Sequence, residues 1–137
     1  IIDLLRQRSR PYLFSNTLAP MICATTLKVL EIITKDSSRR DKVVENAAYF
    51  RAEMEKAGFD LAGKDHAIIP VMLYDAVLSQ KVADKMLEKG IYVTGFFYPV
   101  VPKDKARIRT QMSAAHTKAD IDACVKAFKE CRDEIGF

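Results

Sequence analysis

The chain has 137 residues, of which 49% are hydrophobic and 29% charged, which is typical of one globular domain and too small for two independent cores. Its net charge of +4 is only mildly basic, and the interleaving of Lys and Arg with Asp and Glu favours solvated helix faces over a nucleic-acid surface. No apolar run reaches the roughly 20 residues of a membrane-spanning helix and no secretory signal is recognisable, which argues against membrane and exported proteins.

The first residues, IIDLLRQRSR, have the pattern of the end of an amphipathic helix without a start signal, so we expect the chain to begin inside a larger protein. RPYLFSNTLAP then predicts a short extended segment. Leu18 to Lys35 has the apolar content of a well-buried helix, which Asn16 or Thr17 could cap and whose first turn tolerates Pro20. Capping is the favoured interpretation of residues 15–17 from the pattern alone, and a phosphate held by their unpaired backbone N–H groups is the alternative.

The next elements are a helix over 39–57, a short strand over 59–61 and a strand over 66–73. A helix over 75–89, strands over 91–97 and 106–112, and a helix from 117 to the C-terminus follow. Pro70 lies inside the strand of residues 66–73 and predicts an edge strand or a bulge, because proline cannot donate to a ladder. Leu78, Val82, Met86 and Leu87 are expected on the core face of their helix. This order predicts an α+β fold, with a mostly antiparallel sheet of about three to four strands and helices on one face.

Three cysteines, Cys23, Cys124 and Cys131, form no CxxC pair, which favours buried free thiols over a metal site or a disulfide. We therefore expect no metal.

The strand of residues 106–112 carries two arginines on one face. Period two places Arg107, Arg109 and Gln111 on one side and Ala106, Ile108 and Met112 on the other. Arginines are costly to bury without an anion, so one of the two should meet a carboxylate, a phosphate or an internal acid. A non-enzymatic α+β module that binds RNA or a protein is an alternative, but the consecutive Phe96, Phe97 and Tyr98 cannot all face one stacking surface.

Three segments are more specific than these patterns: PYLFSN, HAIIPVML and GIYVTGFFYPVVP with ARIRTQMSAAHT. They resemble the C-terminal part of the α-oxoamine synthase family of fold-type I pyridoxal-phosphate (PLP) enzymes, over essentially the whole chain. The resemblance implies that residues 1–35 are an interface segment and a connecting helix to a large domain outside this chain. Residues 36–137 are then the C-terminal small domain.

The resemblance also implies the chemistry. The last block favours the member that condenses glycine with acetyl-CoA to 2-amino-3-oxobutyrate and CoA. The siblings that make 8-amino-7-oxononanoate or 5-aminolevulinate, and serine palmitoyltransferase, share the architecture and are the near alternatives. It implies a PLP-dependent homodimer inside the cell, in the cytoplasm of a bacterium or the mitochondrial matrix of a eukaryote, with neither nucleic acid nor membrane as partner.

The same resemblance assigns residues. Arg109 matches the arginine that grips the substrate carboxylate, while Arg107 is expected to pair with an internal acid. Ser15 and Asn16 fall in the segment that reaches the cofactor phosphate of the partner subunit. The lysine that binds PLP belongs to the large domain, so we expect no catalytic residue here and no activity from this chain alone.

Overall fold

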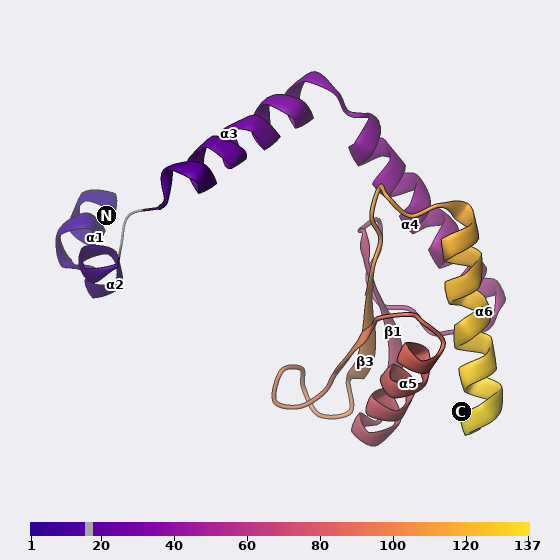
Figure 1. The fold of residues 1–137 in the computed structure, drawn as a ribbon. Coiled ribbons are helices and arrows are strands. Elements are labelled where there is room, and N and C mark those ends of the chain that lie inside the picture. Colours follow the sequence, from indigo (N-terminus) through magenta and orange to yellow (C-terminus); the bar gives the residue numbers. More distant parts are fainter. Residues whose placement is uncertain (16–17) are drawn as a thin grey trace. The chain divides into compact units, whose positions relative to one another are not determined.

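The structure, a computed structural model, describes residues 1–15 and 18–137 (Figure 1). It divides into two compact units, residues 1–37 and residues 38–137. In the described parts of the chain, no helix combines the length and the apolar character needed to cross a bilayer.

The first unit holds three helices, α1 (Ile2–Arg8), α2 (Arg10–Phe14) and α3 (Pro20–Lys35). The extended segment predicted from Arg10 is therefore wrong for its first residues: α2 starts with a proline in its first turn, where a missing N–H breaks no helical bond. The residue at the N-cap of α3 is Ala19, which has no side-chain bond to offer. The predicted caps Asn16 and Thr17 lie outside the described residues.

The helix α3 is apolar around most of its circumference. We predicted burial, yet none of its 16 described residues is buried in this chain. Its hydroxyls satisfy themselves on the helix: Thr25, Thr26 and Thr34 donate to the carbonyls four residues earlier at 2.7, 2.9 and 2.7 Å. Its charged side chains pair with each other, since Lys28 and Lys35 lie 3.1 and 2.8 Å from Glu31. Cys23, expected to be buried, is exposed.

The second unit is an α+β domain, as predicted. Its elements are α4 (Ser38–Lys56), β1 (Ile68–Tyr74), α5 (Ala76–Glu88), β2 (Thr94–Phe96), β3 (Ala106–Gln111) and α6 (Lys118–Ile135). The three strands form one antiparallel sheet in the order β1-β3-β2, so β3 is the central strand. Figure 1 shows α4, α5 and α6 gathered around this sheet.

One face of the sheet and the three helices share a single hydrophobic core. Its fully enclosed side chains come from every layer: Phe50 and Met54 of α4, Ile69 and Val71 of β1, Val82 and Met86 of α5, Ile108 of β3, and Phe128 of α6. Leu87, predicted to be in the core, is 59% exposed, and the fully buried Ser79 lies on the inner face of α5 instead. The core therefore fixes β3 from one side only.

Two strand predictions need correction. The run 59–61 forms a single bridge, between Leu61 and Val71, rather than a strand. The run 91–97 pairs with β3 only over Thr94–Phe96. By contrast, the edge position predicted from Pro70 is confirmed, because β1 is an outer strand of the sheet.

Side-chain caps fix the starts of α5 and α6. Asp75 accepts the N–H of Leu78 at 2.6 Å. The capping box predicted at Thr117 is confirmed, with Asp120 accepting the Thr117 N–H at 2.8 Å and Thr117 Oγ1 accepting the Asp120 N–H at 3.2 Å. The capping box thus fixes the segment between β3 and α6 at the end where α6 begins.

Candidate functional site

The central strand β3 presents different chemistry on its two faces. Ala106, Ile108 and Thr110 are buried, whereas Arg109 and Gln111 are exposed and Arg107 is half-buried. The predicted period-two alternation is therefore confirmed. The outer face, away from the three helices, carries both arginines.

The strand register determines what surrounds these arginines. Arg107 is paired with Met72 on one side and Phe96 on the other, and Arg109 is paired with Pro70 and Thr94. Cross-strand pairs point to the same face of a sheet. The outer face is therefore a mixed surface of two cations set among apolar side chains.

Arg109 is available for an anion. Its Cζ lies 5.0 Å from the centre of the Phe96 ring, and in the described part of the chain its guanidinium has no carboxylate partner. A planar guanidinium can bind a carboxylate through two parallel N–H bonds. Arg109 is thus suited to hold a carboxylate on the outer face.

Arg107 is differently placed. Its Nε is buried and has no hydrogen-bond partner among the described residues. The internal acid that we predicted for Arg107 is not found in the described part of this chain. A buried donor without an acceptor is unfavourable, so the Nε of Arg107 costs free energy in the folded chain.

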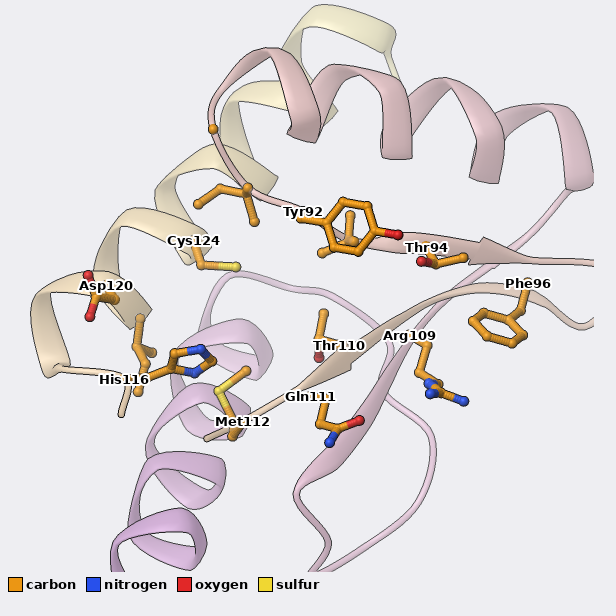
Figure 2. A pocket seen from close by; sticks show the side chains of 14 residues that line it. Tyr92, Thr94, Phe96, Arg109, Thr110, Gln111, Met112, His116, Asp120 and Cys124 are labelled. Atoms are coloured by element: carbon orange, nitrogen blue, oxygen red, sulfur yellow. The ribbon is translucent and has the colours of Figure 1, made fainter. Parts of the chain in front are cut away.

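A cavity of about 530 Å³ adjoins Arg109 (Figure 2). It lies between the segment that leads into β2, the end of β3 and the start of α6. Arg109 and Phe96 stand at one end, and His116 and Asp120 at the other. Between them the lining is mainly apolar, from Ile91, Val93, Met112, Ile121 and Cys124. The cavity combines a cation with an apolar wall, a common composition for small-molecule sites.

The far end of the cavity is held rigidly. The buried Asn46 of α4 donates from Nδ2 to the carbonyls of Ser113 and His116, both at 2.9 Å. His116 Nδ1 accepts the Ser113 N–H at 3.2 Å. The N–H of Thr117 donates to Asp120 and lowers the pKa of that carboxyl. Sequence reasoning missed Asn46, whose signal was a single polar residue beside the apolar Ala47 and Phe50.

The cysteine in the cavity is chemically quiet. Cys124 is half-buried in α6, and its burial raises the pKa of the thiol to about 12. A thiol that stays protonated at neutral pH is a poor nucleophile. Among the described residues, no three His, Cys, Asp or Glu side chains gather as metal ligands.

The predicted cofactor residues belong to the first unit. Ser15 is exposed at the end of α2, where its N–H donates to the carbonyl of Pro11 at 3.0 Å. Asn16 lies outside the described residues. Ser15 and Arg109 belong to different units, and each is described only within its own unit.

The family model for aminotransferase class I and II matches residues 1–128. The 2-amino-3-ketobutyrate coenzyme A ligase of Escherichia coli is 60% identical over 136 residues, which is 99% of this chain and 34% of that protein. The mitochondrial ligase of the same name from Mus musculus is 53% identical over 95% of this chain and 31% of its own length. An 8-amino-7-oxononanoate synthase from Thermosipho melanesiensis is 42% identical over 99% of this chain and 35% of its own.

Solved structures share the fold. A serine palmitoyltransferase from S. paucimobilis, solved with a bound PLP-myriocin aldimine, superposes with a TM-score of 0.90 at 26% identity, over 98% of this chain and 34% of that one. An 8-amino-7-oxononanoate synthase from Francisella tularensis gives 0.80 at 22% identity, over 99% and 40%. The chain spans about a third of the length of the curated relatives it matches.

Proposed function

Because the chain belongs to the aminotransferase class I and II family, we propose that it is the C-terminal part of a PLP-dependent enzyme. The proposed reaction condenses glycine with acetyl-CoA to give 2-amino-3-oxobutyrate and CoA. The identity of 60% to a 2-amino-3-ketobutyrate coenzyme A ligase supports this choice of reaction.

One observation carries the proposed role of this chain, namely the open guanidinium of Arg109. It lies exposed on the outer sheet face, has no acid partner among the described residues, and adjoins a cavity. Arginine is charged at every physiological pH and fits a carboxylate better than lysine does. We assign Arg109 to the carboxylate of glycine, which it would orient for reaction at the neighbouring carbon.

The covalent lysine of a PLP enzyme is proposed to lie outside this chain. No described lysine is buried, and burial is the usual means of lowering a lysine pKa for covalent chemistry. Among the half-buried lysines, Lys89 is held at 2.8 Å by Glu134 and 3.0 Å by Glu130, and these bonds raise its pKa instead. The lysines described here are therefore suited to structure, not to covalent catalysis.

The chain does offer a contact that fits the cofactor phosphate. The Ser15 hydroxyl is exposed and can donate to a phosphate oxygen. We propose Ser15, with Asn16 beside it in the sequence, as phosphate contacts across a homodimer interface. When bound, PLP supplies an electron sink for the electron pair released at the α carbon of the amino acid. For a bacterial source we propose the cytoplasm, and for a eukaryotic source the mitochondrial matrix; the mouse relative is named as a mitochondrial protein.

The test is Arg109→Ala in the whole enzyme. Loss of a charged hydrogen-bond pair should raise the KM for glycine by roughly 10- to 100-fold. The KM for acetyl-CoA and the cofactor absorbance should stay unchanged. Arg40→Ala, which removes an exposed arginine of α4, is the matched control and should leave all three unchanged. An unchanged KM for glycine in Arg109→Ala would remove the carboxylate assignment.

A second candidate reaction is 8-amino-7-oxononanoate synthesis, which the 42% identical relative supports. Mass spectrometry of the product formed by the purified enzyme separates the two candidates. A product other than 2-amino-3-oxobutyrate would replace the first assignment.

A further inference from the structure

We propose that Phe96 is a positioning residue that holds the guanidinium of Arg109 ready for a carboxylate. This inference rests on the proposed function, because it concerns the residue assigned there to glycine. Phe96 matches no part of the predicted site and has no polar group of its own.

The contact itself is a cation over an aromatic face. Arg109 Cζ lies 5.0 Å from the centre of the Phe96 ring, within the range in which the ring quadrupole attracts a cation. The register explains how they meet. Phe96 is directly opposite Arg107, so Arg109 is its diagonal neighbour on the same sheet face. Both side chains line the same end of the cavity (Figure 2).

Phe96 can serve as a fixed platform because its own backbone is fixed. A Cβ on the preceding residue, Gly95, would lie 3.1 Å from the carbonyl oxygen of Ser79 and 3.3 Å from its carbonyl carbon. The backbone of β2 therefore lies directly on α5. Ser79 is fully buried, and its Oγ donates to the Asp75 carbonyl at 2.9 Å. The backbone of β2 contacts α5 on one side and pairs with β3 along one edge, so the position of the Phe96 ring is well defined.

An aromatic partner does something that an acidic partner could not. A carboxylate beside Arg109 would occupy its N–H donors and neutralise its charge before substrate arrived. The Phe96 ring attracts the cation from its face and leaves the N–H donors in the guanidinium plane free for a ligand. The contact therefore restricts the rotamers of the Arg109 side chain, while its N–H donors stay free to bind a ligand.

Arg107 strengthens the assignment by contrast. It occupies the same sheet face two residues away, and its Nε is buried without a partner among the described residues. Its positive charge repels that of Arg109 and gives Arg109 no favourable contact. Arg107 therefore does not hold Arg109 in place, whereas the Phe96 ring attracts its guanidinium.

The experiment uses the whole enzyme with Phe96→Leu, Phe96→Met and Phe96→Tyr. Loss of the cation contact in the Leu and Met variants should raise the KM for glycine by about 3- to 30-fold, with kcat and the KM for acetyl-CoA within about twofold. Phe96→Tyr keeps the aromatic face and should stay within about twofold of the unsubstituted enzyme. Phe97→Leu, at the next and more exposed position, is the matched control and should change none of these constants.

Double variants separate the failure of this inference from that of the proposed function. With Arg109→Ala present, Phe96→Leu should cause no further rise in the KM for glycine, since the ring acts only through that arginine. A full additional rise would overturn the positioning role. If Arg109→Ala raises the KM but Phe96→Leu and Phe96→Met do not, Phe96 is not a positioning residue while the carboxylate assignment stands. If Arg109→Ala itself changes nothing, the proposed function fails first.

A general structural role gives a different result. If Phe96 only filled space, the Leu and Met variants, which are both smaller than Phe by a similar volume, would lower kcat and thermal stability together with any change in the KM for glycine. That pattern would also overturn the proposal.

Discussion

The two faces of the three-stranded sheet follow different rules. The inner face is closed by the chain itself: Ile69, Val71 and Ile108 have no exposed surface and pack against three helices. The outer face carries Arg107 and Arg109 among apolar neighbours, and Arg109 lines the cavity. The inner face therefore holds the fold together, whereas the outer face keeps unused binding capacity.

This contrast shows how the single strand β3 can both stabilise the core and present side chains for binding. Alternation along β3 puts every second side chain into the core, so the strand is held firmly from behind. The alternate residues on the outer face, such as Arg109, are then free of packing constraints and can carry polar or charged groups. An arginine on a rigid strand is positioned more accurately than one on a loop.

The largest difference in stability between the two sheet faces is expected from Ile108→Ala. Removal of a fully buried side chain from the central strand should lower the free energy of unfolding by about 2–5 kcal/mol, because the cavity left behind cannot collapse completely. Urea unfolding of the chain measures this change. Arg109→Ala, one residue along on the outer face, should change it by less than about 0.5 kcal/mol. Equal losses for the two variants would remove the distinction between the faces.

A smaller loss is expected from Gly95→Ala, at the edge of the inner face. The added methyl group would meet the backbone of Ser79 at 3.1 Å, so β2 or α5 must shift. Overpacking of this kind should lower the free energy of unfolding by about 1–3 kcal/mol. Thermal and urea unfolding measure the loss, and Gly63→Ala is the control for a glycine with nothing within 4 Å of the new Cβ. Because Gly63 has a positive φ, the control carries backbone strain but no clash. An unchanged stability for Gly95→Ala would show that β2 does not rest on α5 as closely as described.

The smallest effect is expected from Arg107→Met on the outer face. This change removes a buried Nε that has no partner among the described residues, and should raise the free energy of unfolding of this chain by about 1 kcal/mol. Arg109→Met is the comparison, with a change within about 0.5 kcal/mol. A clear loss of stability in Arg107→Met would mean that this arginine contributes bonds to the folded chain that its geometry does not show.

Much of the second unit could be read from the sequence, because its signals are local. The alternation of β3, the capping box at Thr117 and the edge position of Pro70 each depend on a few neighbouring residues. The misses depend on distant contacts. Leu87 is exposed because the inner face of α5 centres on Ser79, where the backbone of β2 approaches. The hydrophobic pattern of α5 alone could not show that Gly95, in a later strand, would pack against Ser79 and so decide which side of α5 faces inward.

The candidate site divides in the same way. Arg109 was found from its spacing on the strand and from family resemblance, and its role in binding glycine stays a prediction. The contact with Phe96 was not predicted, because it depends on the register between β2 and β3. Asn46 was missed because a single polar residue in a helical pattern does not reveal the two carbonyls, 67 and 70 positions later, that it binds.

The helix α3 has a consequence for how the protein is assembled. Many of its residues are branched at Cβ, a class with modest intrinsic helix propensity, and a lone helix of 16 residues is only marginally stable in water. With its threonine hydroxyls and its charged stripe already satisfied internally, the free energy that keeps α3 helical must come from covering its apolar sides. Formation of this helix and its association with a neighbouring surface are therefore one linked equilibrium, so a ligand or subunit that stabilises the covered state also increases the helical content of this segment.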